Sequence, residues 1–222
     1  MGEMITFKRP DAKSCSGYYA EPEGGGSAPG VVVIQEWWGL NDQIKGVADQ
    51  LAANGYRVIV PDLYRGTVTL EAAEANHMME ELNFADAATQ DIRGAAQYLN
   101  TQGTKVGVIG FCMGGALTVL SAVHVPELDA AVCWYGVPPE EAGDPRTISI
   151  PFQGHFAQND SFFPPEQVND LEARLKEGDV QHELYRYEAE HAFGNENGES
   201  YNPEAKQQAW TRSLAFLSAH LK

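Results

Sequence analysis

The chain has 222 residues, of which 43% are hydrophobic and 10% aromatic, a size and composition that fit one α/β domain. Its formal net charge is −16, from 15 Lys and Arg against 31 Asp and Glu. Such a charge argues against a nucleic-acid partner, whose phosphates are neutralised by Lys and Arg, and against an anionic membrane surface. No stretch approaches the roughly 20 consecutive apolar residues that span a bilayer, and residues 1–19 lack an apolar signal-peptide core.

These properties predict one domain over residues 1–222, in the cytoplasm, with a small-molecule substrate and no nucleic-acid or membrane partner. We expect a monomer or a homodimer. The three cysteines, Cys15, Cys112 and Cys133, have no C-x-x-C spacing, and the six histidines have no paired metal-binding spacing. The sequence therefore predicts free thiols in a reducing compartment and no metal or organic cofactor.

The predicted elements alternate between strands and helices. Short β-branched runs bounded by turn residues predict buried strands, and apolar residues at helical spacing predict helices. In chain order they are an initial β segment, a Gly/Pro-rich loop at 21–30, a strand at 30–36, a helix at 41–56, a strand at 57–64, helices at 70–82 and 84–100, a strand at 105–110, a helix at 112–123, strands at 128–136 and 148–158, a helix at 164–178, a strand at 182–188 and a helix at 202–222.

This alternation is typical of a mostly parallel sheet with helices on both faces. In such sheets the chemically active groups gather at the carboxyl ends of the strands. Reactive side chains are therefore expected directly after the predicted strands.

The segment GVIGFCMGGAL, residues 107–117, lies between a predicted strand and a predicted helix. It follows the G-x-S-x-G pattern of a nucleophile elbow, with Cys112 in the nucleophile's position. Gly110 and Gly114 have no side chains to collide across the sharp turn. The start of a helix favours the thiolate form of Cys112, and the backbone N–H of Met113 is placed to donate to an oxyanion.

A cysteine beside glycines can also be an inert core residue, so a base and an acid are needed. Asp160 follows one predicted strand in a polar turn, and His191 follows the next in a loop. Each of them alone could be an ordinary turn or loop residue. The order Cys112, Asp160, His191, each after its own strand, is the chain order of α/β-hydrolase triads.

At these residues the chain resembles the dienelactone hydrolase family, a cysteine branch of the α/β-hydrolases. The resemblance covers nearly the whole chain and lies in five segments: VVVIQEWWGL, GYRVIVPDLY, KVGVIGFCMGGAL, YGV at 135–137 and HAF at 191–193. It implies an α/β-hydrolase fold, Cys112 as nucleophile, His191 as base and Asp160 as the residue that orients the base. It also implies that Glu36 contacts the resting thiol and controls the thiolate, and that the N–H of Trp37 is a second oxyanion donor.

The chain departs from the family pattern where the family's dienelactone hydrolases bind a substrate carboxylate with arginines. Four residues after His191 the chain has Asn195, and residues 66–84 contain neither Arg nor Lys. Arg65 falls too early to match. Aromatic residues are the candidates for the pocket instead: Trp37, Trp38, Phe84, Trp134, Tyr135, Phe162 and Phe163, with Trp38, Tyr135, Phe162, Phe163 and Asn195 expected to bind substrate. An uncharged, aromatic pocket suits neutral aryl or short acyl esters or lactones.

The sequence thus predicts an ester hydrolase that works through a covalent intermediate on Cys112. The chain is also similar to a dienelactone-hydrolase-like protein with promiscuous phosphotriesterase activity, which implies phosphotriester hydrolysis as a second activity. Three alternatives remain open: a redox protein with Cys112 as its reactive thiol, a non-catalytic binding protein on a hydrolase scaffold, and a true dienelactone hydrolase.

Overall fold

The computed structural model describes residues 2–100 and 103–222, and its centre is a single sheet in the strand order β1-β2-β4-β3-β5-β6-β7-β8. The first two pairings, β1 with β2 and β2 with β4, are antiparallel, and all the others are parallel. The strands are β1 (Glu3–Lys8), β2 (Ser14–Ala20), β3 (Gly30–Ile34), β4 (Arg57–Pro61), β5 (Val106–Phe111), β6 (Ala130–Trp134), β7 (Phe152–Asn159) and β8 (His182–Glu190). The predicted α/β fold with a mostly parallel sheet is confirmed.

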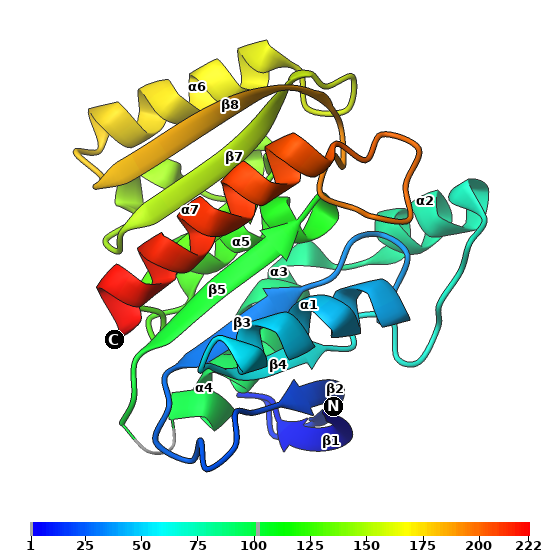
Figure 1. Ribbon diagram of the computed structural model, residues 1–222, viewed down its shortest axis with the longest axis vertical. Coiled ribbons are helices and arrows are strands. Elements are labelled where there is room, and N and C mark those ends of the chain that lie inside the picture. The colour runs from blue at the N-terminus through cyan, green and yellow to red at the C-terminus, as the bar shows by residue number, and fades with distance from the viewer. Residues whose placement is uncertain (1, 101–102) are drawn as a thin grey trace.

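Helices cover both faces of the sheet (Figure 1). They are α1 (Asp42–Ala53), α2 (Ala72–Glu81), α3 (Phe84–Asp86), the π-helix η1 (Ala87–Ile92), α4 (Arg93–Asn100), α5 (Met113–His124), the 3-10 helices η2 (Glu140–Ala142) and η3 (Pro145–Thr147), α6 (Pro165–Glu177) and α7 (Pro203–Leu221). Side chains along β3 alternate between the faces: Val31 and Val33 pack with α1 and α7, whereas Val32 and Ile34 pack with α4 and α5.

Most bounds shift by one to three residues, and two of the differences from the predicted elements have a clear structural reason. The strand expected at 148–158 begins only at Phe152, since Pro151 precedes it and residues 148–151 lie outside the sheet. The helix expected at 84–100 is interrupted by the π-helical turn η1, which contains the buried Asp91. The carboxylate of Asp91 receives hydrogen bonds from Arg9 and Arg65, so the interrupted helix is tied to the N-terminal hairpin.

The parallel strands end on the side of the molecule where α2 and the loop before α7 lie (Figure 1). Gln35 and Glu36 follow β3, Cys112 follows β5, Asp160 follows β7 and His191 follows β8. The sheet therefore brings residues that are up to 156 positions apart in sequence to one edge.

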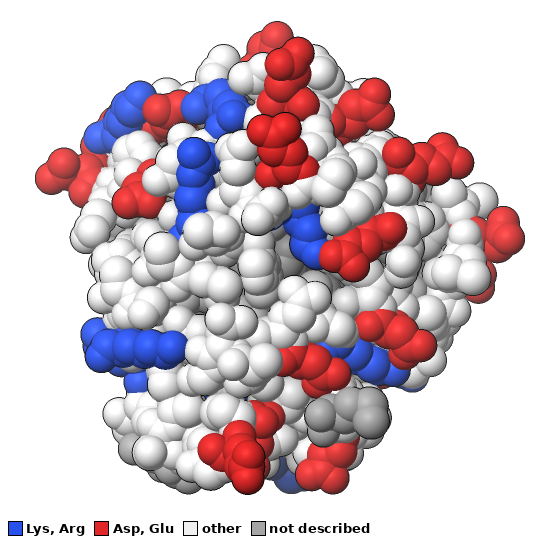
Figure 2. All heavy atoms as spheres, in the orientation of Figure 1, with Lys and Arg blue, Asp and Glu red and all other residues white. Residues whose placement is uncertain are grey.

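The surface reflects the composition of the chain. Figure 2 shows carboxylates scattered over one face, with Lys and Arg between them and no continuous basic patch on that face. Among the described residues, no helix combines the length and apolarity needed to cross a bilayer.

Candidate active site

The turn between β5 and α5 holds Cys112 in a backbone conformation that few non-glycine residues adopt. Its φ is 56° and its ψ is −117°, directly before the first residue of α5. A Cβ on Gly110 would collide with the carbonyl of Gly114, and a Cβ on Gly114 with the carbonyl of Ile34. Both glycines are therefore required for the turn, as the elbow pattern predicts.

Cys112, His191 and Asp160 lie in one hydrogen-bonded row. His191 Nε2 is 3.0 Å from Cys112 Sγ, and His191 Nδ1 is 2.8 Å from Asp160 Oδ2. The side chains of His191 and Asp160 are 12% and 2% exposed, so little water competes for this contact. The structure thus brings together the three residues that the sequence predicted as a triad, in the geometry that proton transfer from thiol to imidazole requires.

A tight turn fixes the carboxylate of Asp160. Its Oδ1 accepts the backbone N–H groups of Phe162 and Phe163 at 2.8 and 2.9 Å, which leaves Oδ2 for His191. The two phenyl rings pack beside the imidazole, with centroids 4.8 Å and 5.6 Å from the His191 ring. The same turn therefore orients the acid and presents both aromatic rings to the site.

Glu36 is buried at the end of β3, but its partners are not the ones that the family resemblance implies. Glu36 Oε2 accepts a 2.7 Å hydrogen bond from Asn195 Nδ2, and Oε1 accepts one from the Tyr135 hydroxyl at 3.3 Å. The Cys112 thiol contacts His191 in this structure. Burial raises the pKa of Glu36, and the hydrogen bond from Asn195 opposes that shift.

The net shift in the pKa of the Cys112 thiol is opposite to the contribution of the helix start. Burial and, next, the carboxylate of Glu36 raise the pKa of the thiol, and the backbone N–H of Met113 lowers it by less. The contribution predicted for the helix start is present, since the N–H of Met113 lowers the pKa of the thiol. Burial and the negative charge of Glu36 raise the thiol pKa by more than this N–H lowers it.

A cavity of about 560 Å³, which we call the active-site cavity, opens at these residues. Cys112 and His191 lie on its wall, together with the predicted pocket residues Trp37, Trp38, Phe162, Phe163 and Asn195. Tyr135 was predicted there as well, but it is 1% exposed and does not line the cavity. Its ring packs among buried aromatic rings, including Phe193, and its hydroxyl donates a hydrogen bond to Glu36 Oε1.

No Lys or Arg is present among the described residues that line the active-site cavity, whereas Glu36, Glu190 and Glu199 all lie on its wall. Arg65, the one cation near the corresponding segment of sequence, directs its guanidinium to Asp91 at 2.8 Å. The cavity is therefore aromatic and acidic, which disfavours a substrate carboxylate.

Two features of the site were missed by sequence reasoning. Met79 and Asn76 of α2 line the active-site cavity, although α2 buries only Ala75 and gives no periodic apolar face that would mark a lining. Ala192, directly after His191, has a φ of 60°, so the histidine sits on a left-handed turn where the sequence offers no glycine. Among residues 2–100 and 103–222, no cluster of three or more His, Cys, Asp or Glu side chains is arranged to hold a metal ion.

The chain is similar to known proteins over nearly its whole length. Residues 15–221 match the model of the dienelactone hydrolase family. "Protein usf" of Aquifex pyrophilus is 34% identical over the full length of both chains, and a protein of Aquifex aeolicus named "Putative carboxymethylenebutenolidase" is 32% identical, again over both full lengths. The crystal structure of P91, a dienelactone-hydrolase-like promiscuous phosphotriesterase from metagenomic libraries, is 25% identical with a TM-score of 0.83, covering 100% of this chain and 99% of that chain. The chain belongs to the dienelactone hydrolase family.

Proposed function

We propose that this chain is a hydrolase of small neutral esters or lactones, with Cys112 as nucleophile, His191 as base and Asp160 as its orienting carboxylate. The observation that carries the proposal is the continuous row of contacts, Sγ to Nε2 at 3.0 Å and Nδ1 to Oδ2 at 2.8 Å, at the wall of the active-site cavity. Family membership supports hydrolysis, and the contacts supply the residues for it.

Because the pKa of the Cys112 thiol is raised, the thiol is neutral at rest and must lose its proton as it reacts. His191 Nε2 accepts the proton while Sγ attacks the substrate carbonyl carbon. The carbonyl electron pair moves to oxygen, where the backbone N–H groups of Met113 and Trp37 stabilise the negative charge. The tetrahedral intermediate then expels the alkoxide, which takes the proton from His191 and leaves a thioester on Cys112.

Deacylation reverses these roles with water as the nucleophile. His191 Nε2 takes a proton from water as its oxygen attacks the thioester carbon. The second tetrahedral intermediate expels the Cys112 thiolate, which recovers a proton from His191 and releases the acid. Asp160 holds the imidazole orientation through both halves by accepting from Nδ1.

The preference for neutral substrates rests on the lining of the cavity. A substrate carboxylate would enter among Glu36, Glu190 and Glu199 with no guanidinium or ammonium among the described lining residues. Buried carboxylates need such partners because the loss of hydration is costly. This argues against a true dienelactone hydrolase, whose substrate is an anion.

Hydrolysis of p-nitrophenyl butyrate by the wild type, Cys112→Ala and His191→Ala tests the assignment. His77→Ala is the matched histidine control, since the His77 side chain is 68% exposed on α2. Loss of nearly all turnover in the two site variants, with the control unchanged, supports the proposal. Ester turnover that survives either site substitution contradicts it.

Phosphotriester hydrolysis is a second candidate, and the similarity to the phosphotriesterase P91 favours it. A neutral phosphotriester needs no cationic clamp, and the same N–H groups could stabilise its phosphoryl oxygen. A diaryl phosphotriester assayed with the same variants tests this. Release of aryl alcohol that depends on both Cys112 and His191 is the expected result.

The redox alternative has less support. Cys15 and Cys133, the other two cysteines, are buried, and burial raises the pKa of each thiol to about 12. Neither has the exposed, acidic thiol of a resolving cysteine. Rapid peroxide consumption by a protein that hydrolyses no ester would reverse this preference and favour the redox function.

A further inference from the structure

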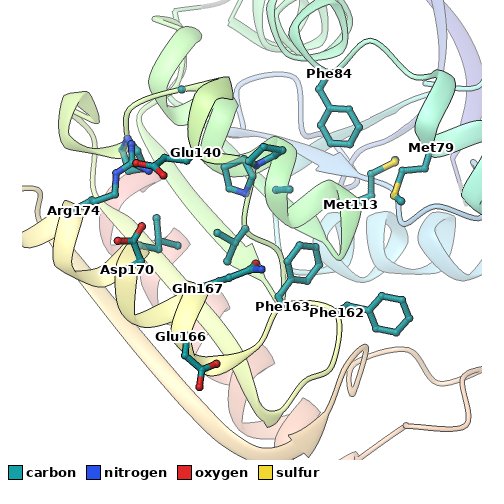
Figure 3. Close-up of a pocket in the computed structure, with 17 residues that line it drawn as sticks. Met79, Phe84, Met113, Glu140, Phe162, Phe163, Glu166, Gln167, Asp170 and Arg174 are labelled. Carbon is teal, nitrogen blue, oxygen red and sulfur yellow. The ribbon is translucent and has the colours of Figure 1, made fainter.

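A second cavity, which we call the side cavity, adjoins the active-site cavity on the α6 side. Its volume is about 640 Å³, and it lies between the start of α5, the segment after β6 and the first turns of α6. Figure 3 shows its inner end near Met79, Met113 and Phe84 and its outer end near Glu140, Asp170 and Arg174.

The two cavities share a wall. Met79, Phe162 and Phe163 line both of them, so these side chains form a partition between the two spaces. Met113, the residue directly after the reactive Cys112, lines the side cavity, and the Tyr64 hydroxyl holds its sulfur at 3.2 Å. The side cavity therefore begins one residue away from the nucleophile.

The inner part of the side cavity is apolar. Ala116 of α5, Val137 and the buried Pro138 add further apolar groups to the lining of this cavity. At the outer end the cation of Arg174 already has a carboxylate nearby, Asp144 Oδ1 at 3.6 Å. An acyl group that extends from Cys112 into the side cavity therefore contacts apolar side chains and thioether groups first. It reaches the charged side chains only at the outer end. Such a lining fits an alkyl chain and offers an anionic group no unpaired cation.

We propose that the side cavity binds the acyl chain of the substrate, a medium-length alkyl or arylalkyl group, while the leaving group occupies the active-site cavity. The inference rests on the proposed function. The leaving group must stay within reach of His191, which protonates it, and His191 lines only the active-site cavity. The acyl group stays bonded to Cys112 and must extend away from the leaving group. The space next to Met113, the residue after Cys112, is the side cavity.

The partition residues then select the substrate. Phe162 as a whole residue is 59% exposed, and the backbone N–H groups of Phe162 and Phe163 both donate to Asp160 Oδ1. The backbone of the partition is thus fixed by the triad carboxylate, while the Phe163 ring and the unbranched Met79 side chain can change rotamer. Acyl chains longer than a butyryl group would displace these two side chains and extend into the side cavity.

The test compares kcat/KM for p-nitrophenyl acetate, butyrate, hexanoate and octanoate. Gln167→Trp fills the side cavity from the exposed surface of α6, and Ala173→Trp adds the same ring to an exposed site on α6 outside the lining. Val137→Phe fills the cavity from the segment after β6. We expect both filling variants to lower the octanoate-to-acetate ratio by about tenfold or more, since each buried methylene contributes to binding. Phe163→Ala should raise the ratio, and Ala173→Trp should leave it unchanged.

Varying the leaving group separates the two cavities. The ratio of 2-naphthyl acetate to p-nitrophenyl acetate should be the same in Gln167→Trp and in the wild type. If Gln167→Trp lowers this ratio and spares the octanoate ratio, the side cavity takes the leaving group and the inference is wrong. If neither ratio moves in either filling variant, the substrate does not use the side cavity.

A binding measurement keeps the inference independent of the chemistry. In the Cys112→Ala background, calorimetric titration with octanamide and butanamide reports occupancy without reaction. Octanamide should bind more tightly than butanamide, and adding Gln167→Trp should remove this difference. If Cys112→Ala still hydrolyses esters, the proposed function fails while this comparison continues to decide the role of the side cavity. Equal affinity for both amides in the parent background would overturn the inference.

Discussion

The side-chain amide of Asn195 donates a 2.7 Å hydrogen bond to the carboxylate of Glu36, a residue 159 positions earlier in the chain. Both groups are buried, at 6% and 4% exposed, and both lie on the wall of the active-site cavity. The neutral amide of Asn195 therefore gives the buried carboxylate of Glu36 a hydrogen-bond donor without adding a positive charge. No Lys or Arg is present among the described residues of the cavity lining. A substitution at Asn195 therefore changes both the charge of the cavity wall and the environment of Glu36, the carboxylate that raises the pKa of the Cys112 thiol.

Placing a cation at position 195 should change substrate preference. Asn195→Arg should raise the kcat/KM ratio of p-nitrophenyl hemisuccinate to p-nitrophenyl butyrate by about tenfold, equivalent to about 1.4 kcal/mol. Asn195→Leu, which also removes the hydrogen bond to Glu36 but adds no charge, should leave the ratio near its starting value. An unchanged ratio in the arginine variant would mean that the charge of the lining does not set this preference.

Replacing the carboxylate of Asp160 by an amide should change the tautomer and orientation of His191 without disturbing the fold. In Asp160→Asn the amide oxygen can still accept from Phe162 and Phe163, but the NH₂ group then faces His191 Nδ1 and favours the wrong tautomer. We expect kcat for p-nitrophenyl butyrate to fall by about 1,000-fold or more. The thermal unfolding midpoint should stay close to that of the wild type. A fall in kcat of less than about tenfold would argue that Asp160 does not orient the base.

The raised pKa of Cys112 predicts how the thiol titrates. The carboxylate of Glu36 disfavours the nearby thiolate, so removing its charge should lower the thiol pKa. In Glu36→Gln the midpoint of the alkylation rate of Cys112 by iodoacetamide against pH should shift to lower pH. The same titration on Cys112→Ala gives the background from Cys15 and Cys133. A midpoint that stays in place or moves to higher pH would contradict the assigned role of Glu36.

A buried histidine away from the site should make stability depend on pH. Burial, with the charge of Arg212, lowers the pKa of His155 to about 3, and its ring is held by Tyr187, Gln153 and Ser213. The unfolded chain binds a proton at about pH 6.5 while the folded chain does not, so the stabilisation present above that pH is lost as the pH falls toward 3. Between pH 7.5 and 5, His155 should remove about 2 kcal/mol of the free energy of unfolding.

Urea unfolding of the wild type and His155→Gln at these two pH values measures this effect. The variant is expected to be less stable at pH 7.5, because glutamine cannot keep all three contacts, and to lose less stability on acidification. His124→Gln on α5, whose ring is largely exposed, is the matched control and should titrate like the wild type. Equal losses in wild type and His155→Gln would show that another group causes the acid sensitivity.

Much of the fold and of the site follows from local sequence. Buried β-branched runs and capped amphipathic segments mark the central strands and helices, because strands buried on both faces and helices with one apolar face each have a characteristic pattern. The glycines around Cys112 predict the strained turn since no other residue fits the close backbone approaches there. Asp160 and His191 could be proposed as partners of Cys112 because each follows its own predicted strand in the chain order of α/β-hydrolase triads.

The tertiary structure decided what depends on residues distant in sequence. The direction of the Cys112 pKa shift follows from burial and from Glu36, which the local helix start could not reveal. Tyr135 lies beneath the cavity rather than on its wall because it packs with Phe193 and donates to Glu36. The side cavity exists only where α2, α5, α6 and the segment after β6 meet. Sequence thus determined the candidate reactive residues and their order, whereas packing across the sheet edge determined their burial, their partners and the space around them.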